Sequence, residues 1–273
     1  MTSGQPKERV DVLLVQRGLV ETREQAKRSI MAGIVFSAET RLDKPGEKIK
    51  IDAPLSVKGS ALKYVSRGGL KLEKALEVFN ISVEDKIVLD IGSSTGGFTD
   101  CALQNGAKHC YALDVGTNQL AWKIRSDERV TVMEKTNFRH AVPEDFTNGT
   151  PQVATIDVSF ISLTLILPPL KQIIAFGGDV VALVKPQFEA GKDKVGKKGI
   201  VRERSVHLEV LQKIAESSRV NGLSLKGISF SPVTGGEGNI EFLFHLRSEE
   251  EPVNPYDESA FVKLITEAYE ALT

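Results

Sequence analysis

A glycine-rich turn reads Asp90-Ile91-Gly92-Ser93-Ser94-Thr95-Gly96-Gly97-Phe98. It joins a short apolar strand, predicted over residues 86–89, to a helix predicted over residues 98–106. The glycines allow a tight turn and a close approach of the backbone to a ligand, and the start of the helix offers free N–H groups. The stretch is therefore the first βα unit of a nucleotide-type α/β fold. It departs from the dinucleotide pattern G-x-G-x-x-G, and the acid before the first glycine leads us to expect Asp90 near the cationic end of a ligand.

Length and composition narrow the class of protein. The chain has 273 residues, of which 41% are hydrophobic, which is enough for one large α/β domain and a small second part. Its two cysteines, Cys101 and Cys110, match neither a disulfide framework nor a zinc ligand set, as is typical of the reducing cytoplasm. The four histidines have no metal-ligand spacing, so we expect no metal site. We also expect neither an export leader nor a membrane span, because no apolar run reaches the roughly 18 residues of a span.

Charge is distributed unevenly along the chain. Residues 1–74 carry 15 Lys/Arg and 9 Asp/Glu, a net charge of +6, whereas the whole chain carries −1, which leaves −7 for the remainder. A basic front half is typical of contact with a polyanion, although a solvated charged surface would have the same composition.

The basic front half has the pattern of a small α+β module. Two helices are predicted within residues 9–33, and short strands are predicted within residues 34–51. Arg23 and Lys27 are four residues apart on the second helix and share one face, with Arg28 beside them. This face can line a phosphate backbone.

Three strings of the front module carry a family resemblance: Arg9-Val10-Asp11-Val12-Leu13-Leu14, Ser29-Ile30-Met31-Ala32-Gly33-Ile34-Val35 and Asp43-Lys44-Pro45-Gly46. They resemble the small RNA-binding domain named after ribosomal protein S-four. Where such modules often have Asn-Gly in a hairpin turn, this chain has Ala38-Glu39. The resemblance implies an RNA partner, and the residues expected to contact RNA are Arg9, Arg23, Lys27, Arg28 and Arg67.

A segment containing proline, glycine and serine separates the two parts of the chain. We therefore predict an RNA-binding domain over residues 1–58, a linker over residues 59–67 and an α/β domain over residues 68–273.

Polar residues follow the predicted strands of the α/β domain. Asp114 ends the second strand, 24 residues beyond Asp90, where an acid typically accepts hydrogen bonds from the ribose of a nicotinamide or adenosyl ligand. Asn137 follows the third strand, residues 130–133, at a loop position suited to an adenine. Ligands of open α/β sheets bind at the carboxyl ends of the strands, so both residues are candidates for ligand binding.

Further charged residues lie at the ends of strands. Asp157 ends the fourth strand, and Lys185 ends the fifth, where a lysine is costly unless it is paired or functional. Lys71 falls at the edge of the apolar stripe of the helix that begins the α/β domain, and an ordinary lysine lying along apolar surface would have the same spacing. Glu241 begins the last strand after a glycine-rich loop.

Lys71, Asp157, Lys185 and Glu241 form a Lys-Asp-Lys-Glu set on four separate elements. The set resembles the tetrad of FtsJ-like RNA ribose 2′-O-methyltransferases, and the glycine-rich turn resembles their cofactor turn, with Thr95 where many members have proline. With the RNA-binding module in front, the whole chain is similar to the TlyA-type proteins, historically called haemolysins. The strings that carry the resemblance are Ser66-Arg67-Gly68-Gly69-Leu70-Lys71-Leu72, Ser94-Thr95-Gly96-Gly97-Phe98-Thr99-Asp100, Ile156-Asp157-Val158-Ser159-Phe160-Ile161-Ser162-Leu163 and Gly238-Asn239-Ile240-Glu241.

The resemblance implies a Rossmann-like methyltransferase domain with a seven-stranded, mostly parallel sheet. It implies methyl transfer from S-adenosyl-L-methionine to a ribose 2′-hydroxyl, with cytidine in ribosomal RNA as the expected target and ribosomal RNA or ribosomal subunits as partners. The residues that would bind the cofactor are Asp90, Gly92, Ser94, Gly96, Gly97, Phe98, Asp114 and Asn137.

The expected chemistry explains these residue types. A ribose hydroxyl is a weak nucleophile, whereas the methyl group of a sulfonium is already activated, so the enzyme must orient the oxygen in line and accept its proton. The resemblance assigns Lys185 as the base, Lys71 as the cation beside it, and Asp157 and Glu241 as the groups that orient the lysines. A lysine acts as a base only when desolvation or a neighbouring cation lowers its pKa, which the two carboxylates oppose.

Other interpretations stay open at this point. One is an inactive RNA-binding factor of ribosome assembly, which the intact set of four charged residues argues against. Another is the membrane-lysing toxin that the older family name implies, which the lack of a cationic amphipathic helix argues against. A nicotinamide ligand would instead indicate a dehydrogenase. The target nucleotide, the ribosomal subunit and the oligomeric state are also left open.

Overall fold

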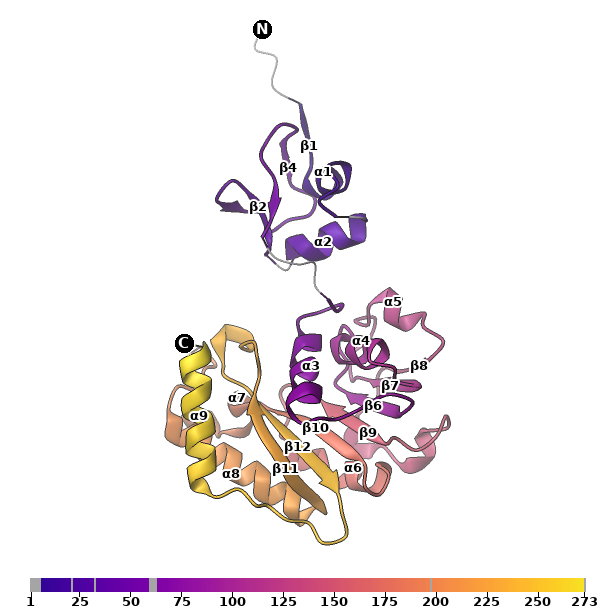
Figure 1. Cartoon of the computed structure of the whole chain (residues 1–273), viewed down its shortest axis with the longest axis vertical. Helices are drawn as coiled ribbons and strands as arrows, with labels where there is room; N and C mark the ends of the chain where they lie inside the picture. Colours follow the sequence, from indigo (N-terminus) through magenta and orange to yellow (C-terminus); the bar gives the residue numbers. More distant parts are fainter. Residues whose placement is uncertain (1–5, 21, 32, 59–62, 197, 273) are drawn as a thin grey trace. The chain divides into compact units, whose positions relative to one another are not determined.

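The computed structural model describes the chain except residues 1–5, 21, 32, 59–62, 197 and 273. It divides into two compact units, residues 1–65 and 66–273 (Figure 1). The predicted linker, residues 59–67, lies partly outside the described residues. The domain boundaries at residues 58 and 68 therefore stay a prediction.

The first unit is a small α+β module. Its two helices meet through residues at helical spacing, because Val10 and Leu14 on the first helix and Ala26 and Ile30 on the second are all buried in one cluster. Two short antiparallel sheets, with the strand orders β1-β4 and β3-β2-β5, complete the unit. Its elements are β1 (Lys7–Arg9), α1 (Val10–Gln16), α2 (Arg23–Met31), β2 (Val35–Ser37), β3 (Thr40–Arg41), β4 (Lys48–Lys50) and β5 (Ser56–Val57).

The hairpin between β2 and β3 shows how the chain turns without Asn-Gly. Ser37 pairs with Thr40, so Ala38 and Glu39 form a two-residue turn. Ala38 has φ +53°, in the left-handed region that glycine and asparagine adopt more easily. The hairpin therefore forms at a cost in backbone strain.

The second unit has the predicted Rossmann-like fold. Its seven-stranded sheet has the order β11-β12-β10-β9-β6-β7-β8, in which β12 runs antiparallel to both of its neighbours and the other pairs are parallel. The elements of this unit are α3 (Gly68–Val78), β6 (Ile87–Ile91), α4 (Gly97–Gln104), β7 (His109–Leu113), α5 (Trp122–Arg125), β8 (Val130–Met133), η1 (Phe138–His140), η2 (Pro143–Asp145), β9 (Val153–Ile156), η3 (Leu163–Leu165), α6 (Leu167–Ile173), β10 (Asp179–Val184), α7 (Pro186–Glu189), η4 (Lys192–Lys194), α8 (Arg204–Val220), β11 (Leu223–Phe230), η5 (Gly236–Gly238), β12 (Phe242–Ser248) and α9 (Glu258–Leu272).

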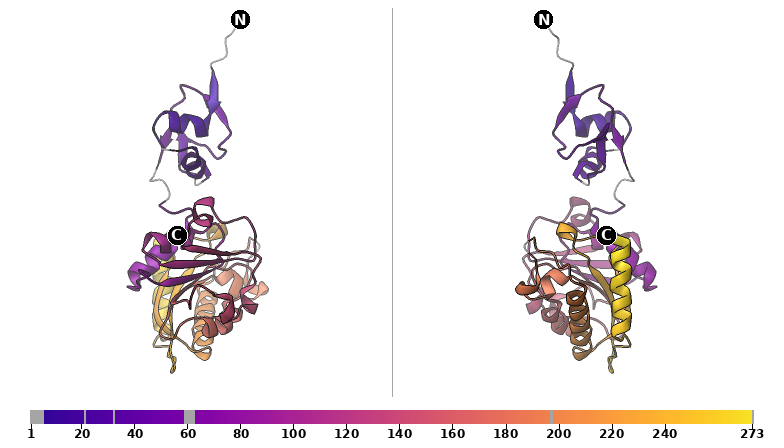
Figure 2. Two further views of the ribbon diagram at one scale, coloured as in Figure 1. Left: turned by 90° about the vertical axis from the view of Figure 1, so that its right-hand side faces the viewer. Right: turned by 90° about the vertical axis from the view of Figure 1, so that its left-hand side faces the viewer.

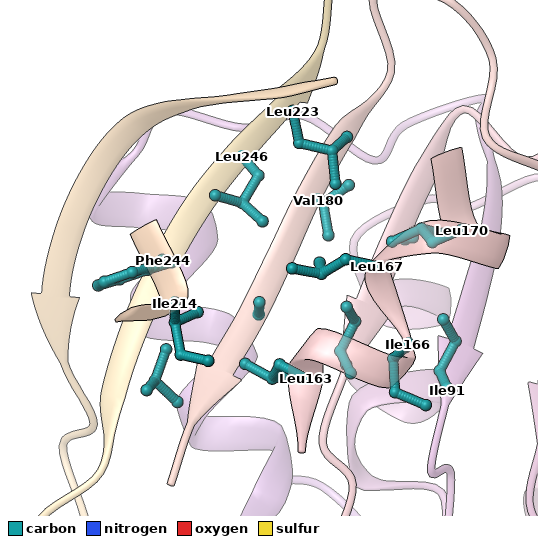
Figure 3. Packing of buried hydrophobic residues seen from close by; sticks show 14 of the residues in the cluster. Ile91, Leu163, Ile166, Leu167, Leu170, Val180, Ile214, Leu223, Phe244 and Leu246 are labelled. Atoms are coloured by element: carbon teal, nitrogen blue, oxygen red, sulfur yellow. The ribbon is translucent and has the colours of Figure 1, made fainter. Parts of the chain in front are cut away.

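Helices lie on both sides of this sheet (Figure 2). Because side chains alternate along a strand, Leu89 and Ile91 of β6 join the large apolar cluster of α6, α8 and α9, whereas Asp90 between them points to the side of α4. Leu167 and Leu170 of α6 and Ile214 of α8 pack against the sheet in this cluster (Figure 3). The fold thus leaves the carboxyl ends of β6, β9 and β10 at one edge of the sheet.

Candidate active site

Four charged side chains meet in a pocket of about 640 Å³ in the second unit. The Nζ of Lys71 lies 2.6 Å from Oε2 of Glu241 and 4.0 Å from Oδ2 of Asp157. The Nζ of Lys185 lies 2.5 Å from Oδ1 of Asp157. These four residues, which we call the charged row, alternate in sign in the order Glu241, Lys71, Asp157, Lys185.

The topology of the sheet explains why these residues meet. Asp157 directly follows β9 and Lys185 directly follows β10, and these strands are parallel neighbours. Glu241 directly precedes β12, which runs antiparallel to β10 with Phe242 opposite Val184, so the start of β12 lies beside the end of β10. Lys71 comes from the first turn of α3.

The charged row is largely shielded from water. The exposed fraction of the side chain is 3% for Glu241, 9% for Lys185, 11% for Lys71 and 20% for Asp157. Buried charges of this kind require opposite partners, and each ammonium group here has a carboxylate. Lys71 is therefore a member of an ion-pair network, which its spacing on the helix did not reveal.

Two polar residues extend the charged row and were missed in the sequence. The Nζ of Lys185 donates a hydrogen bond to Oγ of Ser159 at 3.1 Å. The Nε2 of Gln187 donates to Oε1 of Glu241 at 3.2 Å. Each of them lies two residues from a member of the charged row, and this proximity was the available signal.

The glycine-rich turn lies in the same pocket as the charged row. Gly92 and Gly96 have φ +85° and +92°, and Ser94 has φ +47°. A Cβ on Gly92 would lie 2.5 Å from the carbonyl oxygen of Asp157. Glycine therefore brings the turn directly against Asp157, the member of the charged row that follows β9.

The other glycine of the turn packs against α3. A Cβ on Gly97 would lie 2.9 Å from the backbone nitrogen of Gly69. Phe98, which follows it, is 3% exposed and also lines the pocket. The start of α4 thus packs directly against the start of α3.

Asp90 does not reach the surface of the pocket. Its side chain is fully buried, and its Oδ2 accepts hydrogen bonds from the N–H and the hydroxyl of Thr99 at 3.0 and 2.6 Å. Its Oδ1 accepts from the hydroxyl of Thr155 at 3.0 Å. Burial raises the pKa of Asp90 to about 6. Asp90 therefore ties β6 to α4 and β9, and its place near the cationic end of a ligand stays a prediction.

Asp114 and Asn137 lie outside the lining of this pocket. Asp114 accepts hydrogen bonds from the backbone N–H of Ser94 at 2.8 Å and of Gly116 at 2.7 Å, which fixes one side of the glycine-rich turn. Asn137 is exposed, and its Oδ1 accepts from the N–H of Arg139 at 3.2 Å. Their contacts with ribose and adenine stay predictions.

An exposed aromatic ring at the pocket was also missed. Phe160 is 91% exposed and has φ +62°, which is rare for a bulky residue. Its ring centroid lies 4.9 Å from that of Phe188, which also lines the pocket. Exposed apolar surface combined with backbone strain is typical of a binding residue.

Glu189 holds the segment that carries this ring. Its carboxylate accepts hydrogen bonds from the N–H of Leu163 at 2.7 Å and from the hydroxyl of Ser162 at 2.6 Å. Glu189 is 7% exposed, and burial raises its pKa. Glu189 of α7 thus holds the backbone two to three residues after Phe160.

Two of the residues predicted to contact RNA, Arg9 and Arg23, bind the same carboxylate of the first unit. Arg9 binds the buried carboxylate of Asp11 through two hydrogen bonds of 2.9 and 3.0 Å, and Arg23 binds it at 2.9 Å. The hydrogen bonds from Arg9, with those from Arg23, lower the pKa of Asp11 to about 2. The two arginine side chains remain 41% and 54% exposed.

The other three residues predicted to contact RNA are Lys27, Arg28 and Arg67. Lys27 pairs with Glu24 at 2.7 Å, and Arg28 is exposed on the same helix. Arg67 is exposed and lines the pocket in the second unit. Contact of all five residues with RNA stays a prediction.

Within the described residues, no group of three or more His, Cys, Asp or Glu side chains could hold a metal ion. None of the helices in the described part of the chain is long and apolar enough to cross a membrane.

Comparisons with known proteins agree with both units. Residues 64–248 match the family described as FtsJ-like methyltransferase, and residues 8–53 match the family described as S4 domain. The "Putative rRNA methyltransferase YqxC" of Bacillus subtilis is 65% identical over 268 residues, which cover 97% of this chain and 95% of the relative.

More distant relatives and a solved structure have related names. The "16S/23S rRNA (cytidine-2′-O)-methyltransferase TlyA" of Mycobacterium tuberculosis is 41% identical over 242 residues, 88% of this chain and 90% of the relative. A solved structure named "Putative hemolysin from Streptococcus thermophilus" has a TM-score of 0.79 and 58% sequence identity, and the match covers 98% of both chains.

Proposed function

Since the chain belongs to the FtsJ-like methyltransferase family, we propose that it transfers a methyl group from S-adenosyl-L-methionine to a ribose 2′-hydroxyl of ribosomal RNA. Cytidine is the proposed target nucleoside, because relatives that match most of the chain are named for that activity. The observation that carries the proposal is the charged row beside the glycine-rich turn in one pocket. A ribosomal subunit is the proposed form of the substrate, and the cytoplasm is the proposed compartment.

The residues of the pocket fit this cofactor. The volume of about 640 Å³ lies within the range of roughly 300–1,000 Å³ that is typical of small-molecule sites. Gly92 brings the turn against Asp157 of the charged row. Asp114, outside the lining of the pocket, follows β7, where a carboxylate accepts hydrogen bonds from ribose hydroxyls. When bound, the cofactor supplies a methyl group that is activated by attachment to a sulfonium.

The charged row supplies the remaining chemistry. In this proposal Lys185, in its uncharged form, accepts the proton of the ribose hydroxyl at Nζ. Asp157 at 2.5 Å and Ser159 at 3.1 Å direct that nitrogen. Lys71, held at 2.6 Å by Glu241, places a positive charge near the developing oxyanion.

Phe160 offers a surface for the target base. A ribose can reach a buried lysine only when its nucleotide leaves the surrounding base stack. The exposed ring of Phe160 lies beside Phe188, whose ring centroid is 5.8 Å from Nζ of Lys185, so a base stacked on Phe160 would be near the charged row. Stacking of an unpaired base on an aromatic ring contributes about 1–3 kcal/mol.

The first unit is proposed to hold the RNA. Its match to the S4 domain and the basic side chains of α2 support this role. Contacts with phosphates give affinity without sequence information, so the choice of nucleotide would depend on the pocket of the second unit.

The test is a map of 2′-O-methyl sites in ribosomal RNA from cells with and without this protein. We expect at least one cytidine to lose its methyl group when the protein is absent. Purified small and large subunits, incubated separately with the protein and labelled cofactor, then identify the substrate. An unchanged map together with no transfer to either subunit would refute the proposed function.

A further inference from the structure

One short helix contacts both halves of the charged row. Lys185 and Gln187 lie at the start of α7, on either side of Pro186. Lys185 contacts Asp157 at 2.5 Å, and Nε2 of Gln187 donates to Oε1 of Glu241 at 3.2 Å. The two ion pairs of the row are therefore connected through three consecutive residues.

The backbone between the two contacts is stiff. Proline restricts its own φ and keeps the residue before it extended, and Lys185 has φ −110° and ψ 100°. A side chain that holds Glu241 from this position therefore sets the place of Glu241 relative to Lys185. Glu241 in turn holds Lys71 through its other oxygen, at 2.6 Å.

From this geometry we propose that Gln187 is a positioning residue for the charged row. Its amide N–H fixes one oxygen of Glu241. The other oxygen then holds Nζ of Lys71 at a fixed position relative to Lys185 and the reacting hydroxyl. The inference rests on the proposed function, because the position of Lys71 relative to Lys185 matters only if the charged row acts on a substrate. It adds Gln187 to Ser159 and to the four side chains that the sequence indicated.

Stability does not explain a glutamine at this position. Its Oε1 is buried and has no hydrogen-bond partner among the described residues. A buried acceptor without a donor destabilises the folded state, whereas methionine has a similar length and no such acceptor. The N–H bond to Glu241 is the compensating contact, as expected where a site gives up stability for activity.

The first test is the Gln187→Met variant of the full chain, assayed with labelled cofactor and the ribosomal subunit that the wild type methylates. We expect kcat to fall about 10- to 100-fold, because displacement of a catalytic group by about 1 Å has an effect of that order. Cofactor affinity by calorimetry should stay within about twofold, and the melting temperature should be unchanged or higher.

Gln212→Met is the matched control. Gln212 on α8 also donates to a glutamate, Glu258, at 3.3 Å, but it does not line the pocket. This variant should keep the wild-type kcat. If Gln187→Met also keeps the wild-type kcat, the inference fails and the proposed function stands, whereas absence of transfer by the wild type itself would remove the proposed function.

The Gln187→Glu variant separates positioning from general support of the fold. Two adjacent carboxyl groups repel each other and share a proton at low pH, when one can still donate to the other. Relative to the wild type at the same pH, activity should therefore be retained at the acidic end of the pH profile and lost as the pH rises, which displaces the optimum downward. A profile that keeps the wild-type shape at uniformly lower activity, with a lower melting temperature, would assign Gln187 a structural role only.

Discussion

Asp90 offers a sharp test of the electrostatics beneath the pocket. It is fully buried, and its carboxylate accepts hydrogen bonds from Thr99 and Thr155. An asparagine can keep these contacts, because its oxygen accepts from Thr99 and its amide donates to the hydroxyl of Thr155, which can also act as an acceptor. The Asp90→Asn variant therefore removes the buried charge while it retains the packing.

The size of the effect follows from the pKa. The ordinary pKa of an aspartate is 3.8, and burial raises that of Asp90 to about 6, so ionisation costs the folded state about 3 kcal/mol. Since the pKa is higher in the folded state, the stability contributed by the protonated form is complete below about pH 4 and is lost as the pH rises through about 6. The free energy of unfolding of Asp90→Asn, relative to wild type, should rise by about 2 kcal/mol between pH 4 and pH 7.

Urea unfolding at several pH values measures this difference. The fluorescence of Trp122, the one tryptophan of the chain, reports the second unit. His207 has the opposite effect on the folded state, because burial lowers its pKa to about 4. It destabilises the folded state as the pH falls from about 6.5 toward 4. Its contribution is present in both proteins and cancels in the comparison. A difference in unfolding free energy that stays constant from pH 4 to pH 7 would refute the reasoning.

Three further predictions concern the base, the aromatic ring and the hairpin. Lys185→Ala should abolish methyl transfer in a labelled-cofactor assay while calorimetry shows nearly unchanged cofactor affinity, and normal turnover would contradict its assignment as the base. Phe160→Ala should lower kcat/KM for RNA about 10- to 100-fold, because stacking contributes about 1–3 kcal/mol. Phe160→Tyr and the control Phe176→Ala, which also removes an exposed ring, should not lower it, and equal effects of both alanine variants would contradict stacking. Ala38→Gly should stabilise the first unit by about 0.5–1 kcal/mol by relieving its left-handed φ, seen as slower hydrogen exchange in residues 7–57, and faster exchange would contradict strain at this turn.

Local patterns were enough to predict many of the elements of both units. The spacing of Val10 and Leu14 predicted a helix face, and the glycine-rich turn predicted the first βα unit, because helical and strand periodicities depend on interactions within a few residues. The rule that ligands meet the carboxyl ends of strands also singled out Asp157, and the cost of an unpaired lysine at the end of an apolar strand singled out Lys185.

The partners of these residues depended on tertiary structure. Lys71 had the spacing of an ordinary helix lysine, and only the antiparallel insertion of β12 beside β10 brings Glu241, 170 positions later, within 2.6 Å of it. The contacts of Asp90 also depended on tertiary structure, because the alternation of side chains along β6 turns it toward Thr99 of α4.

The sequence by itself determined many of the helices and strands, the glycine-rich turn and the residue types available for chemistry, since these follow from local periodicity and backbone preference. Tertiary structure decided which charges pair, which are buried, and that Gln187 and Phe160 belong to the pocket. The physical reason is that pairing and burial depend on strand order and on side-chain direction, which join residues far apart in the chain. The glycine-rich turn acquires its place in the chemistry only because Gly92 packs against the backbone of Asp157.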